Sequence, residues 1–239
     1  MRVITHGWEV DSASVADAGL VVFNDDPLSG PAVQNLLGPE VRLQVARIPF
    51  PSPDGPSLQM LLTAAAATIL PSDPVPVIGF ACTTGAVEIG EQGLRKAVAR
   101  PGQDVVCCDP INAAGEALAL MGIGRVAILC PYEEPDSLTI ASAVAAGGIE
   151  VATLCYLSAD NALIPKVSRE TILGAARDAG EGVDALFISC TGLNATPLID
   201  ALEDALGIPV LTSLQVLAWQ IARELARPIR KGPGRLFSQ

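Results

Sequence analysis

The sequence of 239 residues predicts an α/β fold with two pseudo-symmetric lobes and a candidate active site in the cleft between them. Short apolar runs alternate with helical patterns along the chain, which is typical of buried parallel strands joined by helices. Two of these runs, VPVIGFACTTG and DALFISCTGL, end in Cys-Thr, and their cysteines, Cys82 and Cys190, lie 108 residues apart. Strands that begin at Gly19 and Arg125 lie 106 residues apart. We therefore expect an internal duplication, with a four-stranded parallel sheet in each half.

In the first half, each predicted strand is an apolar run bounded by turn residues. We expect strands over residues 19–23, 41–48, 75–81 and 104–108, and helices over 30–37, 57–70 and 87–99. The proline-rich segment 49–56 is predicted to be a loop and a candidate lid over the site.

The second half repeats the order of the first. We expect strands over residues 125–130, 149–157, 184–189 and 209–212, with helices over 112–121, 136–146, 197–206 and 214–225 and a further helix from Ser168. The predicted lobes are residues 17–110 plus 213–227, on the side of Cys82, and residues 111–212, on the side of Cys190. Residues 1–16 are expected to be an N-terminal extension and residues 228–239 a mobile basic tail.

The two cysteines occupy equivalent places, just beyond a buried strand and before the next helical pattern. Ligands of open α/β sheets bind at this edge. A thiol at a helix N-terminus lies near free backbone N–H groups and the positive end of the helix dipole, which favours the thiolate. The hydroxyls of Thr83 and Thr191 would add donors beside each sulfur. Two opposed thiols can act as acid and base on opposite faces of one carbon, or as nucleophile and proton donor.

Composition excludes several classes of protein. The net charge of −11 argues against nucleic acid or an anionic membrane surface as a partner. The longest apolar runs are too short to span a bilayer, and the N-terminus lacks the pattern of a signal peptide. Six cysteines without a regular framework indicate reduced thiols, so we expect a cytoplasmic protein. The one histidine and the absence of a CxxC spacing argue against a zinc site.

From about Gly19 to Arg227, the sequence resembles the aspartate/glutamate racemase superfamily, and most of all its maleate cis–trans isomerase branch. Arylmalonate decarboxylases and ectoine-utilisation racemase-like proteins are its relatives. The strongest motifs are ACTTG around Cys82 and FISCTGL around Cys190. Supporting motifs are RVAILCPY, which ends at Tyr132, DNALIPKVS, which contains Asn161, and PVLTSLQVLAW. Decarboxylases of this superfamily keep only the second cysteine, whereas this chain has both.

The resemblance implies a role for each matching residue. Cys82 would attack the alkene carbon of a maleate-like substrate, and Cys190 would donate and accept a proton on the opposite face. The expected substrate-binding residues are Asn24, Asp26, Thr83, Thr84, Tyr132, Asn161, Thr191 and Gly192. The resemblance also implies that no metal or organic cofactor is needed, because backbone N–H groups stabilise the developing charge. A homodimer is expected from the family.

One position departs from the family pattern. After the first strand, the isomerases present an asparagine to a substrate carboxylate, and the matching residue here is Asp26, or Asn24 if the alignment shifts by two residues. A carboxylate at 4 Å from another would cost roughly 1 to 4 kcal/mol. An aspartate in place of the asparagine therefore favours an amino acid or its derivative as the substrate. It also favours racemisation over isomerisation.

Three hypotheses follow from these observations. The first is a cofactor-independent, two-cysteine isomerase or racemase of a small carboxylate or amino acid. The second is an arylmalonate-type decarboxylase that needs only Cys190. The third is a non-catalytic protein that binds a small molecule.

Overall fold

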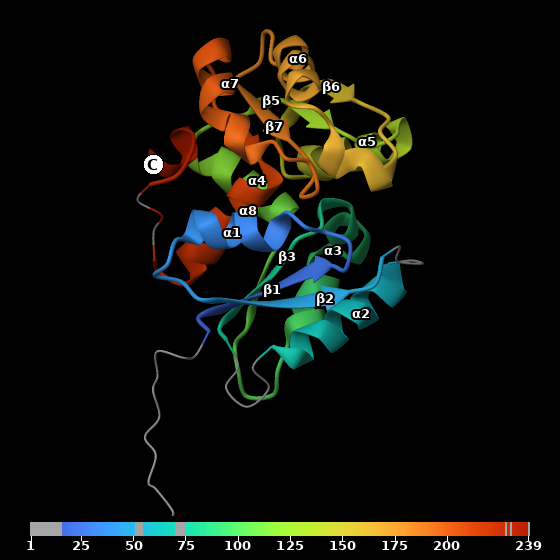
Figure 1. Cartoon of the computed structure of the whole chain (residues 1–239), viewed down its shortest axis with the longest axis vertical. Coiled ribbons are helices and arrows are strands. Elements are labelled where there is room, and N and C mark those ends of the chain that lie inside the picture. The colour runs from blue at the N-terminus through green and yellow to red at the C-terminus, as the bar shows by residue number, and fades with distance from the viewer. Residues whose placement is uncertain (1–15, 51–54, 70–74, 228, 230, 239) are drawn as a thin grey trace, which may run out of the picture.

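Two parallel sheets, one above the other in Figure 1, form the two lobes of the molecule. The computed structural model describes residues 16–50, 55–69, 75–227, 229 and 231–238. The strand order is β2-β1-β3-β4 in the first sheet and β6-β5-β7-β8 in the second. The second order is the first with each number raised by four, which confirms the predicted pseudo-symmetric α/β fold. The exact residue limits of the lobes stay a prediction.

The two central strands of the first sheet are rich in Val, Ile, Leu and Phe and are buried on both faces, as expected for a covered parallel sheet. Its strands are β1 (Ala18–Phe23), β2 (Leu43–Ile48), β3 (Val77–Phe80) and β4 (Val106–Cys108). The helices that connect them and lead out of the sheet are α1 (Ser29–Leu37), α2 (Gly55–Thr68), α3 (Thr83–Val98) and α4 (Pro110–Leu120).

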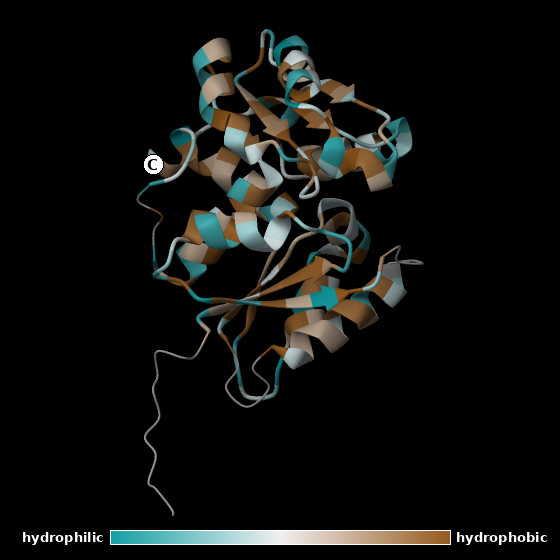
Figure 2. Ribbon diagram, viewed as in Figure 1, coloured by the Kyte–Doolittle hydropathy of each residue, from teal (hydrophilic) through white to brown (hydrophobic). Residues whose placement is uncertain are grey.

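The second sheet is built in the same way. Its strands are β5 (Arg125–Cys130), β6 (Glu150–Tyr156), β7 (Ala185–Ile188) and β8 (Val210–Thr212). Its helices are α5 (Glu134–Ala146), α6 (Arg169–Ala179), α7 (Ile199–Leu206) and α8 (Ser213–Glu224), with short 3₁₀ turns at Asn161–Lys166, Thr196–Leu198 and Arg235–Ser238. Every pair of neighbouring strands in either sheet is parallel. Figure 2 shows hydrophobic residues along the sheets and hydrophilic ones on outer helices and loops.

Helix α8 follows the last strand of the second sheet and then packs on the first lobe. Its Leu217 and Ile221 belong to the same buried cluster as Leu20 of β1. A side chain at Gly79 of β3 would lie 2.9 Å from Ile221, so glycine permits this close approach. On another face of α8, Val216 packs in the core of the second lobe. The helix therefore joins the two lobes through a shared core.

Three features differ from the sequence-based expectations. Helix α3 begins at Thr83, directly after Cys82, and is interrupted at Gly90, where φ is 70°. The strand expected over residues 104–108 is shorter and covers Val106–Cys108. The C-terminal tail, expected to be mobile, is packed in its described part, where Leu236 is 1% exposed. The tail was predicted to be mobile because it is rich in Gly, Pro and basic residues. Its few apolar residues are nevertheless enough to pack it against the second lobe.

Two expectations lie outside the described residues. The N-terminal extension falls almost entirely within residues 1–15, and the centre of the proline-rich loop falls at residues 51–54. Within the described chain, no helix is both long enough and apolar enough to cross a membrane.

Candidate active site

A pocket of about 310 Å³ lies where the two lobes meet, at the carboxyl ends of their strands. It receives side chains from both halves of the chain, including Cys82 and Cys190. Nine of the ten predicted site residues line it: Asp26, Cys82, Thr83, Thr84, Tyr132, Asn161, Cys190, Thr191 and Gly192. The tenth, Asn24, is exposed and is not among the lining residues. The position that faces the pocket is therefore Asp26.

Cys82 is the N-cap residue of α3. Its backbone is extended (φ −151°), and its Sγ accepts a hydrogen bond from the Gly85 N–H at 3.2 Å. The Thr84 hydroxyl lies 3.6 Å from the same sulfur. Both groups lower the pKa of the thiol, but burial acts more strongly and raises the pKa to about 11.

Cys190 lies in a turn after β7, and its backbone has a positive φ of 137°. Only glycine adopts this region readily, and a residue held there costs on the order of 1–3 kcal/mol. Such strain is concentrated at functional sites. Burial raises the pKa of the Cys190 thiol, while the Tyr132 hydroxyl and the amides of Gly192 and Leu193 act to lower it.

Two predictions about the thiols were wrong. Cys190 does not precede an α-helix, because a turn and a 3₁₀ segment separate it from α7, which starts at Ile199. Its amide donors come from the turn instead. The thiolate is also not favoured, because loss of hydration on burial outweighs the amides at both sulfurs.

Three hydrogen bonds connect the segments around the two cysteines. The Thr83 hydroxyl lies 3.1 Å from the Ser213 hydroxyl, and Ser213 Oγ accepts the Cys190 N–H at 3.0 Å. In the other direction, the Thr191 hydroxyl donates to the carbonyl of Ala81 at 3.0 Å. Each threonine thus fixes the backbone beside the cysteine of the opposite lobe.

This arrangement changes the interpretation of Thr83 and Thr191. Both line the pocket, but their hydroxyls already bond to protein groups. We therefore assign them to positioning the loops, and their contact with a substrate stays a prediction. Ser213 was not among the predicted site residues, although the Thr-Ser motif before α8 was a usable signal for it.

Tyr132 and Asn161 enter the pocket from the second lobe. Tyr132 follows β5 and is 7% exposed. Burial, followed by the nearby Cys190, raises the pKa of its hydroxyl well above the usual value, so the hydroxyl keeps its proton. Asn161 starts a 3₁₀ turn in which Asp160 accepts the Ala162 N–H at 2.8 Å. Its side chain is exposed and has no hydrogen-bond partner among the described residues.

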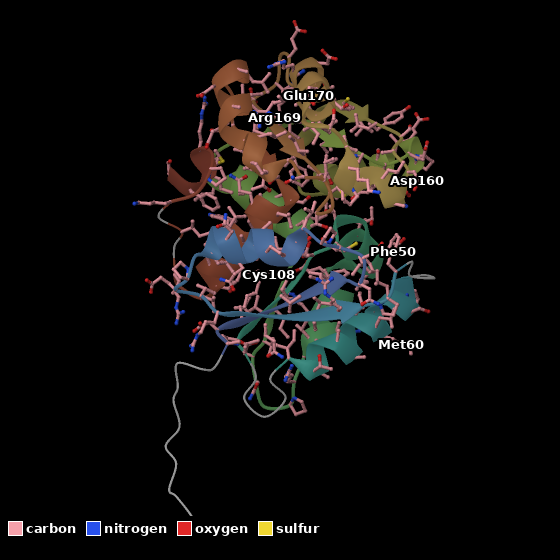
Figure 3. All side chains as sticks on the ribbon, viewed as in Figure 1. Phe50, Met60, Cys108, Asp160, Arg169 and Glu170 are labelled. Carbon is pink, nitrogen blue, oxygen red and sulfur yellow. The ribbon has the colours of Figure 1, made fainter. Side chains whose placement is uncertain are left out.

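Two aromatic rings of the first lobe form an apolar wall. Phe23 and Phe50 line the pocket, with ring centroids 5.2 Å apart and an edge-to-face orientation. Phe50, labelled in Figure 3, is 44% exposed and lies at the level where the lobes meet, on the same side as Asp160 of the other lobe. Phe50 lies in the segment 49–56 that was predicted to be a candidate lid, whereas Phe23 was not among the predicted site residues.

Four carboxylates line the pocket: Asp25, Asp26, Glu88 and Asp136. Sequence reasoning identified only Asp26 among them. No lysine, arginine or histidine is among the described lining residues. Across the described ranges, no group of three or more His, Cys, Asp or Glu side chains is arranged to hold a metal ion.

Comparisons with known proteins agree with this architecture. The family model for arylmalonate decarboxylase matches residues 92–237. Maleate isomerase of Nocardia farcinica is 32% identical over 182 residues, which cover 70% of this chain and 72% of the relative. Maleate isomerase of Pseudomonas putida is 28% identical over 176 residues, which cover 69% of this chain and 70% of the relative.

Two solved structures have the same fold as this chain. A maleate cis–trans isomerase from Nocardia farcinica, a cysteine-to-serine variant with a covalently bound succinylcysteine intermediate, has a TM-score of 0.81 and 23% identity, covering 94% of this chain and 98% of that one. Arylmalonate decarboxylase has a TM-score of 0.77 and 20% identity, covering 92% and 98%. The chain therefore belongs to the family that contains the maleate isomerases and the arylmalonate decarboxylases.

Proposed function

We propose that the protein is a cofactor-independent isomerase that converts a small cis-enedioate of the maleate type to its trans isomer. The observation that carries this proposal is the pair of buried thiols, one from each lobe, that line a single pocket of about 310 Å³. This volume is near the lower end of the range for ligand-binding pockets and therefore suits a small substrate. Both named relatives above are maleate isomerases.

In the proposed mechanism, the Cys82 thiolate adds to one alkene carbon. The π electron pair moves to the neighbouring carbon, which takes a proton from the Cys190 thiol. The former double bond is then single and rotates. Cys190 removes the proton again, the C–S bond breaks, and Cys82 leaves as a thiolate. The reaction consumes no other reagent.

The surroundings of the two sulfurs support this division of roles. Cys82 lies at the N-terminus of α3, where a developing or leaving thiolate meets an amide donor from Gly85. Cys190 has the Tyr132 hydroxyl and two turn amides, which stabilise its thiolate after the proton has left. Because these three groups can donate hydrogen bonds to the Cys190 thiolate, the thiol can give up its proton and take it back.

Proton NMR in D₂O with the purified protein tests the proposal. We expect signals of fumarate to grow from maleate, and we expect Cys82→Ala and Cys190→Ala each to abolish the conversion. Full activity in both variants would contradict the proposal. Release of CO₂ from an arylmalonate by Cys82→Ala would instead support the decarboxylase alternative.

Racemisation of an amino-acid derivative is the second candidate, because Asp26 places a carboxylate in the pocket. Deuterium at the α-carbon of aspartate, together with its D-enantiomer, would support it. Tight binding of a carboxylate without turnover would support a binding protein.

The compartment and the assembly are also proposals. The six cysteines are free, which suits the reducing cytoplasm. We propose a homodimer, which sedimentation equilibrium of the full chain would test.

A further inference from the structure

The pocket carries charge that does not suit a dianion. Asp25, Asp26, Glu88 and Asp136 all line it, and the described lining residues include no cationic side chain. Arg47 of β2 donates to the main-chain carbonyls of Phe23, Asn24 and Asp26 rather than to a carboxylate. A substrate with two carboxylates would therefore meet uncompensated negative charge.

Asp26 is the carboxylate whose orientation is best defined. Its Oδ1 accepts the N–H groups of Leu28 and Ser29 at 2.8 and 2.9 Å, which fixes the side chain at the start of α1. Its Oδ2 has no hydrogen-bond partner in the described part of the chain. The charge of Asp26 acts on Cys190, so both groups face one space. An ionised carboxylate only accepts hydrogen bonds, and the substrate group that meets Oδ2 must therefore be a donor.

We infer that the preferred substrate is the monoamide of a cis-enedioic acid, with its carboxamide N–H₂ directed at Asp26 Oδ2. The inference rests on the proposed isomerase function and replaces one carboxylate of the proposed cis-enedioate by a carboxamide. A carboxamide supplies two N–H donors and carries no charge. The molecule is then a monoanion, which reduces its repulsion by the four carboxylates.

The chemistry of thiol addition favours an amide over an ammonium group as this donor. Addition of Cys82 to the alkene needs a conjugated carbonyl that takes up the displaced π electron pair. An ammonium group on a saturated carbon cannot do so, whereas a carboxamide can. The cycle stays balanced, because the thiol that adds is the thiol that leaves, and the C–N bond of the amide remains intact.

The test compares maleamate with maleate as substrates of the full chain, using proton NMR to follow fumaramate and fumarate. We expect kcat/KM for maleamate to exceed that for maleate at least tenfold. Asp26→Asn keeps an Oδ1 acceptor for the Leu28 and Ser29 amides, so the loop is expected to fold. In this variant, we expect the ratio to shift at least tenfold toward maleate, because the repelling charge has gone.

Glu181→Gln is the matched control, since it makes the same carboxylate-to-amide change at an exposed turn residue outside the pocket. Its maleamate-to-maleate ratio is expected to equal that of the wild type. Maleate turned over as fast as maleamate by the wild type, or a ratio unchanged in Asp26→Asn, would overturn the inference and leave the isomerase standing. No turnover of either compound would overturn the proposed function and the inference together.

Discussion

Burial of Cys82 predicts a steep alkaline dependence of its reactivity. Because its pKa is raised to about 11, deprotonation is the limiting requirement near neutral pH. The thiolate fraction is then about one part in ten thousand at pH 7 and about one part in a hundred at pH 9. Raising the pH over this range should therefore increase the rate of Cys82 alkylation about a hundredfold.

Timed alkylation with iodoacetamide, followed by peptide mapping, measures this rate at Cys82 separately from the other five cysteines. Thr84→Val is an informative variant, since it removes the hydroxyl 3.6 Å from Sγ that lowers the pKa. We expect slower alkylation of Cys82 in this variant at each pH below 9. A rate that levels off near pH 8 in the wild type would show that loss of hydration does not dominate the pKa of this sulfur.

The structure predicts the effects of three further substitutions. Ser213→Ala removes the acceptor of the Cys190 N–H, and we expect kcat to fall about tenfold with an unchanged circular dichroism spectrum. The control Ser142→Ala, at an exposed serine, should have the kcat of the wild type. An unchanged kcat in Ser213→Ala would contradict the proposal that Ser213 positions Cys190. Tyr132→Phe removes a donor to Cys190, so alkylation of Cys190 should slow at each pH, and a faster rate would contradict the assignment. Phe187→Ala opens a cavity in the fully buried centre of β7, and urea unfolding should show a loss of about 3–5 kcal/mol, while a loss below 1 kcal/mol would contradict the packing.

The fold was predictable because the signals were local and repeated. Each strand is an apolar run bounded by turn residues, and the two halves repeat one order of elements. The start of α3 was misplaced because a cysteine rarely serves as N-cap, so the sequence pattern carried no capping signal at Cys82. The docked tail was missed because its apolar residues Leu236 and Phe237 are few and are surrounded by turn formers.

The site was predictable in part. The matched Cys-Thr motifs located both cysteines in one pocket, and the motif around Tyr132 located the tyrosine. The positive φ of Cys190 and the bonds through Ser213 depend on contacts between segments far apart in the chain, so no local pattern indicates them. The thiol pKa was predicted with the wrong sign because a strand end followed by a helical pattern is visible in sequence, whereas the depth of burial is not.

Covalent trapping of a substrate adduct tests the two-cysteine mechanism. Cys190→Ser should slow the last step, in which Cys190 removes the proton and the C–S bond breaks. Intact mass analysis after incubation with maleate or maleamate should therefore show an adduct of one substrate molecule. Peptide mapping is expected to place that adduct on Cys82. The absence of any adduct, together with wild-type isomerisation by Cys82→Ala, would contradict the two-cysteine mechanism.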